Sequence, residues 1–263
     1  MKGDLINQLG IPILAQRLSL PHPALTGLLF AALTGLGLWL AAASLPLVDR
    51  YLPGGPVTTQ ALLEVSWLAL MVWGFMGQRR VYRKRYGERA YRQAAIRYFF
   101  PAFVLMVVGL SRPGFVKGPR LWPAWAGWIA GGLLLTQGTL LSWRAMLAFG
   151  LDRATLIYSY FPEEDVLVES KLYAFLRHPL YAMWLHLALG LALVNGSLVA
   201  LGCAAVFLSK VLIWTWWEER ELVERFGVDY EDYRRRTPAF FPRLRAVPAF
   251  WWTLIRGQLP GDD

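Results

Sequence analysis

Apolar residues run through most of the 263-residue chain in long blocks, and polar residues gather in short segments between them. Blocks of about 20 apolar residues are long enough to cross the roughly 30 Å hydrocarbon layer of a bilayer as helices. The expected helices cover residues 25–48, 61–77, 99–110, 122–147, 180–194 and 198–217. The pattern therefore predicts an all-α, polytopic integral membrane helix bundle with about six transmembrane helices.

The same pattern indicates a single membrane domain over residues 1–263. Residues 1–150 supply four spans, and residues 151–245 supply a polar motif region, the last two spans and a tail. Residues 1–23 are mildly amphipathic and lack the features of a cleaved signal peptide. Two interpretations stay open for them, a helix along the membrane surface and a disordered tail.

Charge fixes the expected orientation. Residues 79–97 carry Arg79, Arg80, Arg83, Lys84, Arg85, Arg89, Arg92 and Arg97 against the single acid Glu88. Because cytoplasmic loops are enriched in Lys and Arg, this segment is expected in the cytoplasm. Six spans then place both termini there as well, N-in and C-in, in agreement with an Arg-rich C-terminal tail. The short, Arg-rich chain favours a bacterial inner membrane.

Composition narrows the functional classes. Hydrophobic residues make up 56% of the chain and charged residues 17%, against roughly 25% charged residues in soluble domains. The net charge of +9 comes from the ends of apolar runs and has no accompanying nucleic-acid motif, so no nucleic-acid partner is expected. The single Cys203 excludes an internal disulfide. The three histidines lack zinc-site spacing, so no metal site is expected.

The first chemical motif is Arg177-His178-Pro179-Leu180-Tyr181. Proline suits the first turn of a helix, where no N–H is missed. Arg177 and His178 would then precede a helix N-terminus, whose free N–H groups and dipole attract anions. The alternatives are an interface-seeking Arg177 and a capping His178.

The second motif begins with Glu218-Glu219 at the end of the last span. Neighbours on a helix point about 100° apart, so one carboxylate is expected to face a ligand and the other to hold an Arg. A surface pair at a helix end is the alternative interpretation. The short turn at residues 195–197 makes the last two spans antiparallel neighbours, and both motifs then meet at one membrane face.

Together the motifs predict a pocket for a zwitterionic amino acid, with donors on one wall and Glu on the other. Tyr181, Tyr230, Tyr233 and Trp217 add aromatic surface suited to a nucleobase or a cationic sulfur. A ligand that combines these groups is S-adenosylmethionine.

The residues from Tyr173 to Pro242 resemble the isoprenylcysteine carboxyl methyltransferase superfamily, which includes phospholipid N-methyltransferases and bacterial thiol methyltransferases. The resemblance rests on the first motif and on Glu218-Glu219, Leu222, Phe226-Gly227, Tyr230, Tyr233, Arg236 and Pro238, about a quarter of the chain. It implies in-line methyl transfer from S-adenosylmethionine at the cytoplasmic ends of the last two spans. The cofactor-binding residues would be Tyr173, Arg177, His178, Pro179, Tyr181, Glu218, Glu219, Tyr230, Tyr233 and Arg236. His178 and Arg236 would be the catalytic residues.

Two departures from the family pattern affect the acceptor. Many members have Gly where this chain has Lys171, and carboxyl methyltransferases have Arg just before the Glu pair, where this chain has Trp214, Trp216 and Trp217. The acceptor is therefore expected to be lipophilic or small, as a carboxylate, thiol or lipid amine. We expect it to enter from the membrane lipid, past the polar stripe around Gln137.

Two rival functions remain open. One is an NADPH-dependent membrane reductase of a sterol or related lipid, with the basic segment 79–97 holding a phosphate. The other is a non-catalytic membrane protein. Binding of S-adenosylmethionine, NADPH or neither separates the three.

Overall fold

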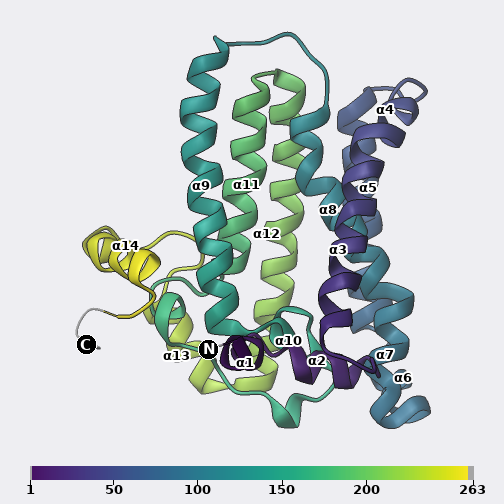
Figure 1. Ribbon diagram of the computed structural model, residues 1–263, viewed down its shortest axis with the longest axis vertical. Helices are drawn as coiled ribbons and strands as arrows, with labels where there is room; N and C mark the ends of the chain where they lie inside the picture. The colour runs from purple at the N-terminus through teal and green to yellow at the C-terminus, as the bar shows by residue number, and fades with distance from the viewer. Residues whose placement is uncertain (1, 260–263) are drawn as a thin grey trace.

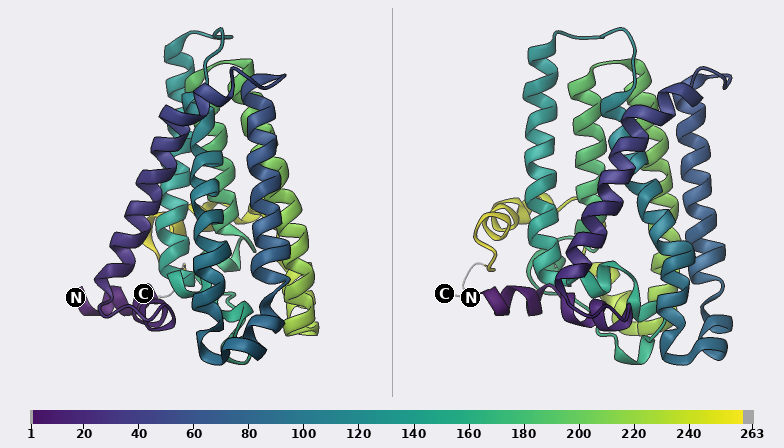
Figure 2. Two further views of the ribbon diagram at one scale, coloured as in Figure 1. Left: turned by 90° about the vertical axis from the view of Figure 1, so that its right-hand side faces the viewer. Right: turned by 45° about the vertical axis from the view of Figure 1, so that its right-hand side comes forward.

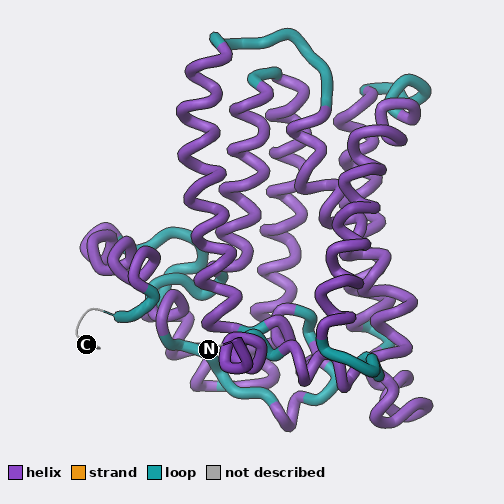
Figure 3. The backbone as a smooth tube through the Cα atoms, in the orientation of Figure 1, coloured by secondary structure: helices purple, strands orange, loops and turns teal. Residues whose placement is uncertain are grey.

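A computed structural model describes residues 2–259, and this part of the chain consists of helices and loops (Figure 1, Figure 3). Strands are absent from the described range, where the only sheet-like pairing is an isolated antiparallel bridge between Arg120 and Ser197. The predicted all-α fold is confirmed.

Long helical stretches stand side by side and form the body of the molecule (Figure 1, Figure 2). They are α3 (Ala24–Trp39), continued by η1 (Leu40–Ser44) and α4 (Leu45–Val48); α5 (Gly55–Leu68), continued by η2 (Ala69–Met76); α6 (Arg79–Tyr86), continued by η3 (Gly87–Arg89), α7 (Ala90–Ala94), η4 (Ala95–Phe99) and α8 (Phe100–Phe115); α9 (Ala124–Phe149); α11 (Pro179–Asn195); and α12 (Leu198–Phe226). The first three stretches and α12 are long and apolar enough to cross a membrane. The other two predicted spans correspond to α9 and to the shorter, 17-residue α11.

The third stretch differs from its prediction. A short span beginning near Phe99 was expected after a basic connector, but the helix runs from Arg79 to Phe115 over 37 residues. The basic segment is therefore the first part of this helical stretch. Pro101 does not end it, because it lies at the start of α8, where proline is tolerated.

Short elements gather at the end of the bundle that carries α6 (Figure 1). They are α1 (Lys2–Gln8), α2 (Ile11–Arg17), α10 (Leu151–Ala154) and α13 (Val228–Arg236), while α14 (Val247–Arg256) lies beside α9. The Leu151 N–H donates to the Leu9 carbonyl at 2.7 Å, and Leu14 is fully buried. The N-terminal segment is thus a helical part of the fold, and the disordered-tail interpretation is wrong for its described residues.

The turn between α11 and α12 brings the two motifs together. Gly196 has φ of 80°, a left-handed conformation that glycine adopts without a Cβ penalty. Ser197 then caps α12, with its Oγ accepting from the Ala200 N–H at 3.1 Å. The helices run antiparallel, so the start of α11 and the end of α12 lie at the same end of the molecule.

A glycine seam holds α9 against α11, the most extensive helix contact in the fold. A Cβ added at Gly131 would lie 2.5 Å from the Gly190 carbonyl oxygen. Small residues let two backbones approach closely where lipid provides no hydrophobic driving force. The seam therefore fixes α11, and with it the first motif, against α9.

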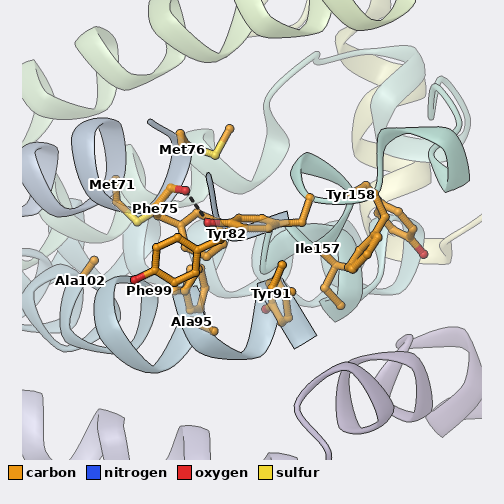
Figure 4. Close-up of a cluster of buried hydrophobic side chains, with 14 of the residues drawn as sticks. Met71, Phe75, Met76, Tyr82, Tyr91, Ala95, Phe99, Ala102, Ile157 and Tyr158 are labelled. Carbon is orange, nitrogen blue, oxygen red and sulfur yellow. Dashed lines mark hydrogen bonds between the residues drawn. The ribbon is translucent and has the colours of Figure 1, made fainter. Parts of the chain in front are cut away.

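An aromatic cluster closes the bundle at the motif end (Figure 4). It joins Phe75, Tyr91 and Phe99 to the segment around Ile157 and Tyr160. The Tyr160 hydroxyl donates to the Phe75 carbonyl oxygen at 2.6 Å. This bond ties the loop after α10 to the ends of the spanning helices.

Candidate functional site

The start of α11 faces the end of α12, as the sequence predicted. His178 precedes α11, and Pro179 occupies its first position. Arg177 donates from Nε and Nη2 to Glu219 Oε1 at 2.9 and 2.7 Å. His178 Nε2 lies 3.0 Å from the same oxygen. Glu219 is therefore the acid that holds the arginine.

Arg177 also binds the C-terminal segment. Its Nη1 donates to the carbonyl oxygens of Arg234, at 3.0 Å, and of Thr237. The backbone N–H groups of Arg177 and His178 donate to the Pro238 and Ala239 carbonyl oxygens at 2.9 and 3.0 Å. We call Arg177, Glu219 and segment 237–239 the clamp.

The clamp changes one expectation. An anion was expected to dock on the free N–H groups before α11, with Arg177 beside them. Both N–H groups and three guanidinium nitrogens already have partners within the chain. The predicted anion site is therefore occupied by the protein's own C-terminal segment.

A cavity of about 460 Å³ lies beside the clamp, within the size range of ligand pockets. The predicted cofactor residues that line it are Tyr173, Arg177, His178, Tyr181, Glu218, Tyr230 and Tyr233. Pro179, Glu219 and Arg236 are not among the lining residues. Seven of the ten predicted residues are thus brought together around one space.

Glu218 has a different environment from its neighbour. It lines the cavity, and its nearest basic group is His178 Nδ1, 3.7 Å from Oε2. Among the described residues no Lys or Arg forms an ion pair with it, whereas the other two acids of the cavity wall, Asp165 and Glu221, are paired with arginines. A buried carboxylate without a cation favours a positively charged ligand.

Aromatic rings form the wall next to Glu218. The His178 and Tyr181 rings stack 5.3 Å apart at an interplanar angle of 6°. Tyr181 also stacks on Trp184 at 4.8 Å, and its hydroxyl accepts from Trp214 Nε1 at 2.8 Å. The wall offers flat apolar surface with a fixed edge.

Two tyrosines of α13 cover the polar end. The Tyr233 hydroxyl donates to the Tyr173 carbonyl oxygen at 2.7 Å, while the Tyr230 hydroxyl is buried without a partner among the described residues. Burial raises the pKa of Tyr173, Tyr230 and Tyr233. All three therefore keep their protons at neutral pH, and Tyr230 has a spare O–H donor facing the cavity.

Arg236 lies elsewhere. It is the last residue of α13, its side chain is 60% exposed, and it pairs with Glu169. Its guanidinium extends away from the cavity, so the structure gives no place for the catalytic role expected of Arg236. Sequence spacing alone could not show this, because a long side chain at a helix end can turn either way.

A second charged group at the cavity was not predicted. Arg225 binds Asp165 at 2.6 Å and Glu221 at 2.5 Å, and it donates to Ser159 Oγ at 3.2 Å. Arg153 lies 3.5 Å from Asp165. A signal was present, since residues 218, 221, 222 and 225 recur at the spacing of one helix face.

The remaining lining is apolar and comes from helices of the bundle. It includes Thr26, Gly27 and Phe30 of α3, Phe103 and Met106 of α8, and Met146 and Phe149 of α9. Gln137 does not line the cavity, and Thr136 and Thr139 bond carbonyls of their own helix at 2.9 and 2.8 Å. The expected route past this polar stripe is therefore not supported.

Both departures from the family pattern have structural settings. Lys171 has φ of 55°, a left-handed conformation that glycine adopts without penalty. Trp214 lines the cavity, Trp217 stacks on Trp214 at 5.3 Å, and Trp216 is exposed on the outside. At these positions only Trp214 replaces a polar group with an aromatic one at the cavity.

Similarity to known proteins is concentrated in this part of the chain. Residues 126–229 match the family model described as phospholipid methyltransferase. The chain is 27% identical over 124 residues to protein-S-isoprenylcysteine O-methyltransferase of Rattus norvegicus, covering 45% of this chain and 42% of that protein. It is 36% identical over 129 residues to the cobalt-zinc-cadmium resistance protein CzcN of Cupriavidus metallidurans, covering 46% and 54%.

A shorter alignment, 40% identical over 77 residues, relates it to methanethiol S-methyltransferase 2 of Bradyrhizobium diazoefficiens, covering 28% of each chain. The chain thus spans about half the length, or less, of these curated relatives. No solved structure gives a significant match. These similarities confirm the resemblance to the isoprenylcysteine carboxyl methyltransferase and phospholipid methyltransferase superfamily.

Proposed function

We propose that this protein is an S-adenosylmethionine-dependent membrane methyltransferase that acts on a lipophilic or small acceptor. The observation that carries the proposal is Glu218, a cavity-lining carboxylate without a Lys or Arg partner in the described chain. The similarity of residues 126–229 to phospholipid methyltransferases supports the same reaction class.

The lining residues fit this cofactor. Glu218 would accept the ammonium group of its amino-acid end, and the unpartnered Tyr230 hydroxyl would donate to a ligand acceptor. Tyr181 and Trp214 offer ring faces to the base or the cationic sulfur. When bound, the cofactor supplies a methyl group already activated by its positive sulfur.

The chain's own residues would then act mainly by positioning and by excluding water. His178 lies between the two glutamates and against Tyr181, which suits a residue that shapes the cofactor site. The apolar lining from α3, α8 and α9 suits an acceptor that comes from the membrane lipid. We propose this face of the bundle as the acceptor side, in place of the stripe around Gln137.

We place the cavity on the cytoplasmic side of a bacterial inner membrane. The basic α6 lies at the same end of the bundle as the cavity's polar end (Figure 1), and Lys- and Arg-rich segments are retained in the cytoplasm.

Calorimetry with S-adenosylhomocysteine and detergent-purified protein tests the proposal. We expect wild-type binding and a loss of about tenfold to a hundredfold in Glu218→Gln, since a charge-assisted hydrogen bond is removed. The matched control is Glu224→Gln, an exposed acid of the same helix outside the cavity, which should bind as wild type.

The other outcomes point to the rival functions. A folded wild type that ignores S-adenosylhomocysteine but binds NADPH would support a membrane reductase. A folded wild type that binds neither would support a non-catalytic protein.

A further inference from the structure

A pair of opposite charges is buried inside the bundle, outside the polar end of the cavity. Lys210 of α12 and Glu64 of α5 are 1% and 3% exposed, and Lys210 Nζ lies 3.1 Å from Glu64 Oε2. Gln60 Nε2 donates to Glu64 Oε1 at 2.5 Å and to the Gly109 carbonyl oxygen at 3.1 Å. Charges at membrane depth are costly and mark functional positions, so this pair calls for a role.

Aromatic rings surround the ammonium group. Lys210 Nζ lies 4.0 Å from the ring centroid of Phe207, 4.4 Å from that of Trp67 and 5.8 Å from that of Trp184. Trp67 and Trp184 line the cavity, and Lys210 does not. The cation therefore stands behind the aromatic wall and attracts it through ring quadrupoles.

The wall leads from Lys210 to the site in a short series of contacts. Trp67 meets Trp214 edge to face, with ring centroids 5.1 Å apart at 83°. Trp214 Nε1 donates to the Tyr181 hydroxyl at 2.8 Å. Tyr181 stacks on His178, which lies 3.7 Å from Glu218. Each step is a directional contact, so displacement of Trp67 is transmitted to the surroundings of Glu218.

We propose that Lys210, neutralised by Glu64, is a positioning residue that sets the geometry around Glu218 through Trp67, Trp214 and Tyr181. The inference rests on the proposed function, because it takes Glu218 as the ligand-binding carboxylate. Lys210 itself touches no ligand, so its removal should weaken binding less than the removal of Glu218 does.

The bundle contains a matched control for a purely stabilising ion pair. Arg112 is 1% exposed, and its Nη2 lies 2.8 Å from Asp49 Oδ1 and 2.8 Å from the Pro56 carbonyl oxygen. Neither Arg112 nor Asp49 lines the cavity. Breaking this pair should cost stability as breaking the Lys210 pair does, without reaching the wall.

The experiment measures two properties of the full-length protein. The first is the Kd of S-adenosylhomocysteine by calorimetry for wild type, Lys210→Met, Lys210→Arg and Arg112→Met. The second is the ¹⁹F spectrum of 5-fluorotryptophan-labelled protein, with the Trp67 and Trp214 signals assigned by Trp67→Phe and Trp214→Phe.

We expect Lys210→Met to raise the Kd about three- to thirtyfold, the range of a desolvated cation–π contact, and to shift both tryptophan signals. Lys210→Arg should restore most of the affinity, since a guanidinium also stacks on rings. Arg112→Met should leave the Kd and both signals unchanged.

Two results would overturn the inference while leaving the proposed function intact: an unchanged Kd in Lys210→Met, or an equal loss in Arg112→Met. Absence of binding in the wild type would refute the proposed function instead. The ¹⁹F spectra decide the positioning role even then, since unmoved Trp67 and Trp214 signals in Lys210→Met would exclude it.

Discussion

The clamp around Glu219 and the cavity wall around Glu218 start from adjacent residues of one helix and have different partners. Both glutamate side chains are 15% exposed. Glu219 binds Arg177, and Glu218 has only the more distant His178. Equal burial with unequal pairing indicates that partners, and not burial, separate a residue that holds the fold from one that is free for a ligand.

The largest expected effect tests the clamp side of this comparison. Glu219→Gln should lower the free energy of unfolding by about 3 to 5 kcal/mol, because it leaves the buried Arg177 without its counter-charge. Thermal unfolding in detergent measures the loss. The double variant Arg177→Met with Glu219→Met should lose less than the sum of the single variants. Additive losses would show that the two side chains do not act as a pair.

A smaller effect is expected on the cavity side. Tyr230→Phe removes a buried hydroxyl that has no partner in the described chain, so stability should hold or rise slightly. The Kd of S-adenosylhomocysteine should rise about fivefold, the equivalent of one neutral hydrogen bond near 1 kcal/mol. Tyr233→Phe is the contrasting variant, since it loses a hydrogen bond to the Tyr173 carbonyl oxygen and should lose stability. Reversal of the two stabilities would contradict the assignment.

The smallest effect concerns the backbone that carries Tyr173. Lys171 is exposed and left-handed, with φ of 55°. Lys171→Gly should raise the free energy of unfolding by up to about 1 kcal/mol, because the strain of a left-handed non-glycine residue is relieved. Neither the clamp nor Glu218 is altered, so the Kd of S-adenosylhomocysteine should not change. A loss of stability would indicate that chain entropy outweighs the strain.

The meeting of the two motifs could be predicted because it depends on local features. Asn195-Gly196-Ser197 is too short to join the helices in any way but antiparallel, and the angle between neighbours on a helix separates Glu218 from Glu219. Which glutamate faces the ligand could not be predicted. It depends on the rotation of α12, which tertiary contacts such as those of Lys210 and Trp214 determine.

The errors have a common physical origin. The anion site before α11 failed because segment 237–239, some sixty residues downstream, supplies carbonyl oxygens to its N–H groups. The role of Arg236 failed because its partner Glu169 lies far away in the sequence. Contacts between distant segments decided both, and local spacing carries no information about them.

The clamp also sets an order in time. During synthesis α11 leaves the ribosome before segment 237–239 exists, and the chain grows at roughly 5 to 20 residues per second. The start of α11 must therefore wait for its carbonyl partners until the segment after α13 has been made. The spanning helices can enter the bilayer and pair first, and the polar end of the cavity is completed last.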